Sequence, residues 1–344
     1  MTKVTVLPVR TPRQRQAFLT FPWQIYRHDP LWVPPLLSQR KRTIDPARGL
    51  FFQDGYAGLF VAWRNNRPVG TIACAEDLIR TVTHKVGECM LGFFECIDDY
   101  EVAAALFKQA EDWAHQHNLA SLYGTYNLNR EDSRGILVEG RDRPPVSLCG
   151  HNPPYYQAFF EQYGFVQDGG DGLAYIIKVD LAAPEIQHLM RLADKVRQRR
   201  NITVRGGNLN DIDGEIDRIL ELQNRGLAHF EGFTPYTRAS IKAMILPVLD
   251  IIDPELILFA EVDGKPVGWF PGVPNMNELL IHINGLRHPW DYLRLAARMR
   301  RRPECVCIKS VLVLPEYWRR GVAVLLFDEM GRRARARGYR WADL

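Results

Sequence analysis

Cysteine is scarce in this chain, and the cysteines present form no metal-binding or redox pattern. None of the six forms a CxxC pair, and no cluster of histidine and cysteine has the spacing of zinc ligands. We therefore expect no metal site. We interpret the cysteines as reduced thiols in the apolar core of a cytoplasmic protein.

Long hydrophobic runs are also missing. No stretch of about 18 apolar residues occurs, and no signal-peptide pattern follows Met1, so neither a membrane span nor secretion is expected. The formal net charge is only +4, which argues against a general nucleic-acid binder. Basic residues nevertheless gather between Arg287 and Arg340, and this segment should attract a polyanion.

The chain has 344 residues, of which 46% are hydrophobic, and such a length and composition predict two or three globular domains. Residues 1–50 are rich in proline and aromatic residues and predict an N-terminal arm, in which Thr11 caps a short helix. The basic helix predicted over 181–201 either links two domains or packs on the first domain with a solvated face.

A β-hairpin pattern occurs twice. Residues 58–63 and 68–73 flank a turn at 64–67, and residues 256–262 and 265–270 flank Asp263-Gly264. When Phe60 is aligned with Phe259, both copies end in Arg or Lys followed by Pro-Val-Gly, and the second turn is one residue shorter. A repeat at about 198 residues predicts two tandem domains of one fold, at 51–180 and 202–344, the alternative being two chance hairpins.

The segment 307–327 carries the most informative pattern. An apolar strand ends at Pro315, a loop containing arginine and glycine follows, and a helix begins near Gly321. The start of a helix presents unpaired N–H groups and partial positive charge, so a phosphate can bind there. Arg319 and Arg320 add charge for a diphosphate. The alternative is a basic loop that caps a core helix.

This strand, loop and helix resemble the acetyl-CoA-binding motif of the GCN5-related N-acetyltransferase (GNAT) superfamily. Pro315, Gly321 and Ala323 are in register with that motif, whereas Trp318 stands where Arg or Gln is usual and Arg319 where Gly is common. The resemblance implies acetyl-CoA as cosubstrate, with the strand backbone on the pantetheine arm and the loop on the pyrophosphate. The implied cofactor-binding residues are Leu312, Val313, Leu314, Arg319, Arg320, Gly321, Val322 and Ala323.

The whole chain also resembles a group of tandem acetyltransferase-like bacterial proteins. The shared segments are Phe-Pro-Trp-x-Ile-Tyr at 21–26, Asp-Pro-x-Trp-Val-Pro-Pro at 29–35, Gly-Phe-Phe-Glu at 92–95 and Asn-Pro-Pro-Tyr-Tyr at 152–156. The expected fold is therefore α/β (α+β), with two tandem GNAT-like domains. Each would hold a mixed, mostly antiparallel sheet flanked by helices.

The first domain lacks the phosphate loop. After its strand at 90–94, residues 95–101 contain four acids and neither glycine nor arginine, and these acids would repel a diphosphate. We expect this domain to keep the fold without binding CoA. Polar loops at 124–132 and 151–156 still supply Asn127, Asn129 and Tyr155 as candidate substrate contacts, although asparagine and proline clusters commonly form turns.

Catalytic residues are harder to identify. Glu278 follows the second hairpin and is a candidate catalytic base, and Asn275 and Asn277 beside it are candidate substrate contacts. Lys309 on the apolar strand is a further catalytic candidate, which could contact a substrate carboxylate. Solvated and turn-forming roles are the alternatives. Residues 339–344 resemble the start of a further strand, so we expect the second domain to lack its last strands and helix, including the tyrosine that is often the family's acid. Either the sequence is truncated there or another chain completes the fold.

Three functions remain open. The first is an acyl-CoA-dependent N-acyltransferase that acts on a small-molecule or peptide amine, in an oligomeric state that the sequence does not define. The second is an aminoacyl or peptidyl transferase similar to the Fem family, which uses such a fold twice and takes aminoacyl-tRNA; only this alternative involves nucleic acid. The third is a non-catalytic CoA-binding protein.

Overall fold

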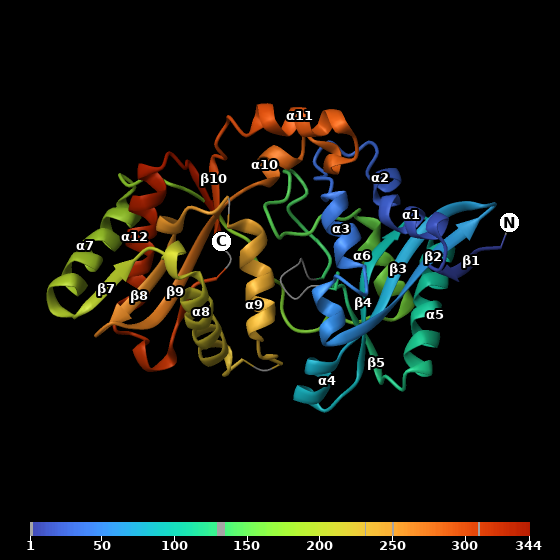
Figure 1. Cartoon of the computed structure of the whole chain (residues 1–344), viewed down its shortest axis with the longest axis horizontal. Coiled ribbons are helices and arrows are strands. Elements are labelled where there is room, and N and C mark those ends of the chain that lie inside the picture. The colour runs from blue at the N-terminus through green and yellow to red at the C-terminus, as the bar shows by residue number, and fades with distance from the viewer. Residues whose placement is uncertain (1–2, 129–134, 231, 250, 309) are drawn as a thin grey trace. The chain divides into compact units, whose positions relative to one another are not determined.

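The computed structural model describes residues 3–128, 135–230, 232–249, 251–308 and 310–344 (Figure 1). Two of the predicted site residues, Asn129 and Lys309, lie outside these ranges. The chain forms two compact units: Met1–Asp171 with Asn277–Arg300, and Gly172–Met276 with Arg301–Leu344. The domain limits expected at 50, 180 and 201 stay a prediction.

The first unit contains a five-stranded sheet in the order β1-β2-β3-β4-β5. All neighbouring pairs are antiparallel except β4 and β5, which are parallel. Its strands are β1 (Thr5–Pro8), β2 (Gly55–Arg64), β3 (Arg67–Asp77), β4 (Glu88–Cys96) and β5 (Ser121–Gly124). The predicted arm at 1–50 thus includes an edge strand of this sheet.

The second unit contains a sheet in the order β6-β12-β10-β9-β8-β7, with β11 paired to β9 beside this path. Only β10 and β12 are parallel. The strands are β6 (Ile176–Lys178), β7 (Ile202–Arg205), β8 (Ile257–Val262), β9 (Lys265–Pro274), β10 (Cys305–Ile308), β11 (Leu312–Val313) and β12 (Trp341–Asp343). Because β6 pairs with β12, the strand that ends at Asp343 has a neighbour on both sides.

The two hairpins are alike in more detail than the sequence alignment suggested. Asn65 and Asn66, like Asp263 and Gly264, have positive φ angles, as the two residues of a type I′ turn require. In both hairpins the register shifts after the Ala–Gly pair, which is Ala62 with Gly70 and Ala260 with Gly268. The prediction that the second turn is one residue shorter is therefore wrong, because Ala62 corresponds to Ala260 and both turns have two residues.

Both faces of each sheet are buried, which explains the near-continuous apolar runs of the central strands. On β3, Ile72 and Cys74 belong to one core, while Ala73 and Ala75 belong to the core on the opposite face. On β8, Leu258 and Phe259 face opposite cores in the same way. This alternation follows from the two-residue period of a strand.

Helices cover these sheets. In the first unit, Thr11 caps α1 with a full capping box and Pro12 opens the helix, as predicted. In the described part of the chain, no helix is both long and apolar enough to cross a bilayer. The α-helices are α1 (Pro12–Thr20), α2 (Pro22–Ile25), α3 (Leu37–Thr43), α4 (Leu78–His84), α5 (Tyr100–Gln116), α6 (Tyr155–Tyr163), α7 (Pro184–Arg199), α8 (Ile212–Leu227), α9 (Arg238–Ile245), α10 (Asn277–Leu280), α11 (Pro289–Arg298) and α12 (Val322–Ala336).

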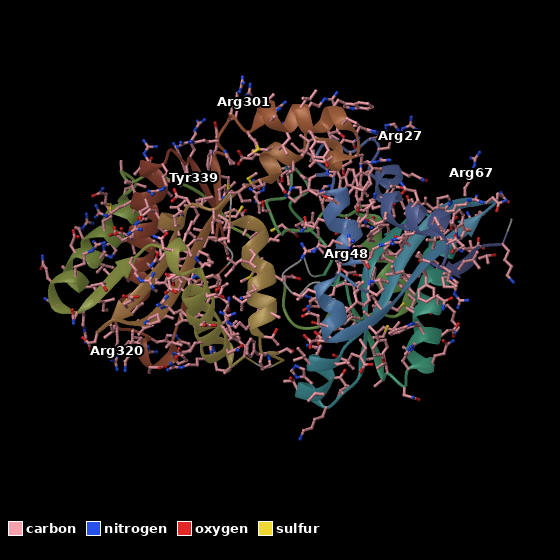
Figure 2. The ribbon with its side chains drawn as sticks, viewed as in Figure 1. Arg27, Arg48, Arg67, Arg301, Arg320 and Tyr339 are labelled. Atoms are coloured by element: carbon pink, nitrogen blue, oxygen red, sulfur yellow. The ribbon has the colours of Figure 1, made fainter. Side chains whose placement is uncertain are left out.

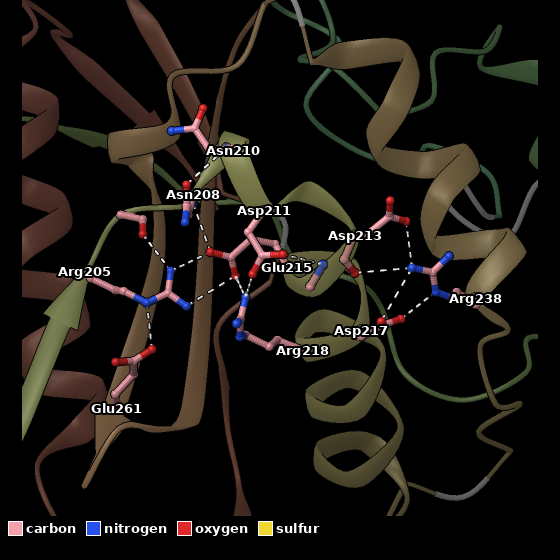
Figure 3. A network of polar contacts seen from close by, with 12 residues as sticks. Arg205, Asn208, Asn210, Asp211, Asp213, Glu215, Asp217, Arg218, Arg238 and Glu261 are labelled. Atoms are coloured by element: carbon pink, nitrogen blue, oxygen red, sulfur yellow. Dashed lines mark hydrogen bonds and ion pairs between the residues drawn. The ribbon is translucent and has the colours of Figure 1, made fainter.

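A polar network fixes α8 to β7 and β8 in the second unit (Figure 3). The buried carboxylate of Glu215 accepts hydrogen bonds from Arg205 Nη1 at 2.6 Å and from the backbone N–H of Asn208 at 2.9 Å. The same guanidinium donates from Nε to Glu261 at 2.6 Å. Because the buried charge has partners on both sides, the network holds the loop between β7 and α8 in one conformation.

Candidate active site

The candidate binding site for the acyl-CoA donor, called the donor site below, begins at β11, a strand that pairs with β9 on one edge. Leu312 and Val313 of β11 pair with Trp269 and Gly268 of β9, and Leu314 N donates to Val267 O at 2.9 Å. Within the described residues, β9 is the only strand that pairs with β11, whereas β10 also pairs with β12. No described strand pairs with the outer edge of β11, although a side chain from the following loop occupies one carbonyl oxygen on this edge.

The loop after β11 leads into α12 with two left-handed residues. A short 3₁₀ turn, η6 (Pro315–Tyr317), comes first, and Arg319 and Gly321 then have φ angles of 59° and 86°. Gly321 is the N-cap of α12 and supplies no capping side chain, so the first turn of the helix keeps its N–H groups available for an anion. A strand, a loop and the start of a helix thus lie where the sequence predicted them.

Gly321 is required for a second reason. A Cβ atom built at this position would lie 2.6 Å from Cγ2 of Val196, a residue of α7. The helix predicted over 181–201 therefore packs closely against the start of α12, and Arg197 reinforces this contact through a 2.6 Å ion pair with the buried Asp328. The glycine combines a left-handed backbone with a close helix–helix approach.

Arg319 and Arg320 provide positive charge beside this helix start. Both are exposed, and no ion pair is described for either within the structure; the side chain of Arg320 points outward at the surface (Figure 2). Its guanidinium lies 5.2 Å from the ring centre of Tyr317. These two side chains can pair with a diphosphate without first breaking a described ion pair.

Trp318, the departure from the expected motif, has a defined role. Its indole Nε1 donates to the carbonyl oxygen of Val313 at 2.8 Å, while its backbone N–H donates to Pro315 O. The indole thereby satisfies one carbonyl of the β11 strand. Trp318 itself is half exposed beside this strand.

The other predicted contacts are spread over both units. Asn275 is buried at the end of β9 in the second unit, where its N–H donates to Cys305 O. Asn277 and Glu278 lie in the first turn of α10 in the first unit, and Asn277 Nδ2 donates to Pro145 O at 2.9 Å. In that unit, Tyr155 Oη donates to Cys96 O at 2.8 Å. Their roles as substrate contacts stay predictions.

In the first unit the corresponding edge is closed by the chain itself. The N–H of Phe93 on β4 donates to Asn127 Oδ1 at 2.7 Å. A Cβ at Gly92 would lie 1.9 Å from Tyr126 O, so the returning chain lies directly against the strand. Asp99, one of the four acids, caps α5 and pairs with Arg64 at 2.6 Å. These contacts support the prediction that this unit does not bind CoA.

The first unit instead contains a cluster of polar groups that the sequence did not predict. Glu95 at the end of β4 accepts hydrogen bonds from Tyr26 Oη at 3.1 Å and Tyr156 Oη at 2.8 Å, both to Oε2. Burial raises the pKa of Glu95 to about 7, although Arg40 and the two hydroxyl donors act in the opposite direction. Glu95 is therefore a carboxyl group that titrates near neutral pH.

A histidine–aspartate pair lies beside this cluster. His151 Nε2 is 2.6 Å from Asp29 Oδ2, and Tyr26 Oη lies 3.2 Å from His151 O, so its one proton can go to this carbonyl oxygen or to Glu95. Burial opposes ionisation of Asp29, but the hydrogen bond with His151 lowers the pKa of this carboxyl below its usual value. The Nδ1 atom of His151 is buried and has no hydrogen-bond partner among the residues that the structure describes.

A sequence signal for this cluster existed. Tyr26, Asp29, Glu95 and Tyr156 all lie in the short segments through which the chain resembles tandem acetyltransferase-like proteins, and His151 immediately precedes one of them. Each segment alone resembles a turn or a strand end. Only the fold brings them together.

Comparisons with known proteins agree with this geometry. The model of the "Acetyltransferase (GNAT) family" matches residues 217–343, which include β8 to β12 and the candidate donor loop. The chain also matches a solved structure, a tandem GNAT protein from the clavulanic acid biosynthesis pathway, with a TM-score of 0.53 and 13% identity over 99% of this chain and 89% of that chain. At this identity the likeness concerns the fold.

Two relatives are more similar in sequence. Protein YghO of Escherichia coli is 31% identical over 287 residues, which cover 83% of this chain and 72% of that protein. Bacterial ceramide synthase of Caulobacter vibrioides is 29% identical over 301 residues, which cover 86% of this chain and 77% of that protein. This chain belongs to the GNAT superfamily as a tandem-domain member, and it is an acyltransferase. The predicted α/β fold with mixed, mostly antiparallel sheets flanked by helices is confirmed.

Proposed function

We propose that this protein transfers an acyl group from acyl-CoA to a primary amine, and that the amine belongs to a long-chain amino alcohol. The observation that carries the proposal is the candidate donor site of the second unit. It has a β11 edge that no described strand covers, an α12 start without a side-chain cap, and two arginines that form no ion pair within the described residues. The acceptor is proposed from the relationship to bacterial ceramide synthase, since a ceramide is the amide of a fatty acid with such an amino alcohol.

Each part of the donor site has a defined task. Arg319 and Arg320, with the first N–H groups of α12, bind the pyrophosphate of CoA. The backbone of Leu312 to Leu314, apart from the Val313 carbonyl oxygen that Trp318 Nε1 occupies, orients the pantetheine arm by strand-like hydrogen bonds on the edge opposite β9. The bound donor supplies an activated thioester carbonyl. Acetyl-CoA, the donor predicted from the sequence, has the shortest acyl chain of this class.

The acceptor must lose a proton to become a nucleophile, and a base is therefore needed. Among the residues predicted from the sequence, Asn275 belongs to the second unit and stays our candidate acceptor contact, whereas Glu278, the base that the sequence suggests, lies in α10 of the first unit.

The test is a reaction of the full chain with sphinganine and acyl-CoA donors of increasing length, including acetyl-CoA and palmitoyl-CoA, with the amide product measured by mass spectrometry. The variant Arg319→Gln/Arg320→Gln should raise KM for the donor roughly tenfold to a hundredfold and change kcat little, because these side chains bind a part of the donor that does not react. The matched control Lys41→Gln/Arg42→Gln removes two adjacent exposed charges from α3 and should leave both parameters unchanged.

The alternatives give distinct results. Retention of aminoacyl-tRNA on a filter, without calorimetric binding of any acyl-CoA, would replace the proposal with a Fem-like transferase. Binding of CoA without turnover over a broad amine panel would indicate a non-catalytic protein. Acetylation of short amines with no reaction on sphinganine would keep the donor and contradict the acceptor.

A further inference from the structure

Helix α11 has an unusual surface. Trp290, Tyr292 and Leu293 are 53%, 56% and 75% exposed, and Met299, which ends the helix, is 56% exposed. Ordinary surface helices turn their polar residues to solvent and their apolar residues to the core. In α11 the large apolar side chains face solvent.

The helical period places these side chains together. At about 100° per residue, seven residues fall on one continuous arc of roughly 180°, and charged residues are absent from it. All seven are exposed. They are Pro289, Trp290, Tyr292, Leu293, Ala296, Ala297 and Met299. We call this arc the apolar face of α11.

The opposite side of the helix is attached to the first unit. Asp291 is fully buried and accepts a hydrogen bond from His288 N at 3.0 Å, which closes the N-terminal cap. Just before the helix, Arg287 lies 4.8 Å from the ring centre of Trp23, and Trp23 Nε1 donates to Asn284 at 2.7 Å. The helix is therefore fixed by its polar side and presents its apolar face outward.

Positive charge borders this face. Six arginines occur between 287 and 302 against one acid, the buried Asp291. Arg294 lies next to the apolar arc and is 61% exposed, and Arg300, Arg301 and Arg302 follow the helix directly. In the described part of the chain, no ion pair is recorded for these last three arginines, and Arg301 lies at the surface in Figure 2.

From these features we infer that α11 and the arginines after it form a docking surface for an anionic lipid bilayer. The helix lies in the plane of the interface, with Trp290, Tyr292 and Leu293 inserted at the level of the headgroups and upper acyl chains. Tryptophan and tyrosine favour this depth because their rings are apolar and carry one polar atom. Arg300 to Arg302 bind the anionic headgroups.

A lipid surface fits these observations better than a protein partner does. A protein-binding helix commonly carries one narrow apolar stripe for a groove, whereas this apolar face is about half of the helix circumference and is bordered by arginine. The inference does not depend on the proposed reaction, because a vesicle without acyl-CoA or amine is a sufficient ligand.

The experiment is flotation of the full chain with vesicles of phosphatidylcholine, with and without phosphatidylglycerol. We expect binding only to vesicles that contain phosphatidylglycerol, and weaker binding as salt rises. Trp290→Ser/Leu293→Ser should lower partitioning about tenfold. Arg300→Gln/Arg301→Gln/Arg302→Gln should lower it by on the order of a hundredfold.

Matched controls separate this surface from general effects. Val82→Ser/Val166→Ser removes two apolar side chains that are 77% and 88% exposed elsewhere in the first unit. Lys41→Gln/Arg42→Gln/Arg48→Gln removes three exposed charges from the same unit. Both controls should bind like the native protein.

Three results would overturn the inference. The first is no binding to vesicles that contain phosphatidylglycerol. The second is an equal loss in the control variants, which would make the effect one of total charge or total apolar surface. The third is native vesicle binding by Trp290→Ser/Leu293→Ser together with loss of an oligomer in light scattering, which would identify the apolar face as a contact between two copies of this chain.

Discussion

The contact between Gly321 and Val196 allows a quantitative test of the donor-site geometry. In Gly321→Ala, the added Cβ would lie 2.6 Å and 2.8 Å from the two γ carbons of Val196, well inside ordinary contact distance. Valine cannot easily move aside, because its β-branched side chain is stiff. Overpacking of this kind costs about 1–3 kcal/mol. The left-handed backbone at φ 86° costs an alanine a further 1–2 kcal/mol or so.

The free energy of unfolding of Gly321→Ala should therefore fall by about 2–5 kcal/mol in urea denaturation. Val196→Ala alone removes two methyl groups from a half-buried position and should cost about 1 kcal/mol. In the double variant the two shortest contacts are gone and the Cβ of residue 196 stays at 3.3 Å, so mainly the backbone strain and the lost methyl groups remain. We expect a favourable coupling energy of about 1–3 kcal/mol between the two sites.

Additive effects, with a coupling energy below about 0.5 kcal/mol, would refute this reasoning, because residues that do not touch are expected to behave in that way. A matched control is Gly338→Ala with Val196→Ala. Gly338 also has a φ angle of 86°, but a Cβ there meets no atom within 4 Å. That pair should show the backbone strain without the coupling.

Three further predictions concern stability. Folding raises the pKa of Glu95 from 4.5 to about 7, so between these pH values the folded state binds more protons than the unfolded state. The free energy of unfolding should therefore fall by up to about 3 kcal/mol as pH rises through this window. A flat pH profile for the native protein, or the same slope in Glu95→Gln, would contradict this. Arg205→Met should lower the free energy of unfolding by about 2–3 kcal/mol in chemical denaturation, because it leaves the buried Glu215 without this ion pair. Arg205→Met/Glu215→Met should recover much of this stability. No recovery would show that the unpaired carboxylate is not the cause. Thr11→Ala should lower the thermal midpoint by removing the α1 cap, worth about 1 kcal/mol, whereas Thr11→Ser should not.

The second half of the chain was predictable because its signals are local. The donor-loop pattern consists of adjacent features: the apolar strand, Pro315, the arginine-rich loop and Gly321. Each of them determines the backbone conformation only of nearby residues. The hairpin of β8 and β9 is local for the same reason. Matching Phe60 with Phe259 displaces the two hairpins by one residue, because both strands have their register shift beside an alanine, Ala62 or Ala260.

Two features could not be read from the sequence because they depend on distant residues. The three residues of β6 are exposed and have no distinctive pattern, and their pairing with β12 joins segments far apart in the chain. Similarly, Tyr26, Glu95 and Tyr156 each have an ordinary local explanation. Their hydrogen bonds exist only because α2, β4 and α6 pack together in the first unit.

The way in which the two units share the chain constrains the order of folding during synthesis. The first unit needs residues 277–300, because Asn284 and Arg287 hold Trp23. The second unit contains Ile176–Lys178 but completes that strand's pairing only when Trp341–Asp343 has been made. A nascent chain of about 170 residues thus contains the sheet of its first unit but not α11. The first unit is therefore still incomplete when synthesis of the second unit begins. Such long-range pairing predicts slow folding, with both units reaching their final form only after most of the chain has left the ribosome.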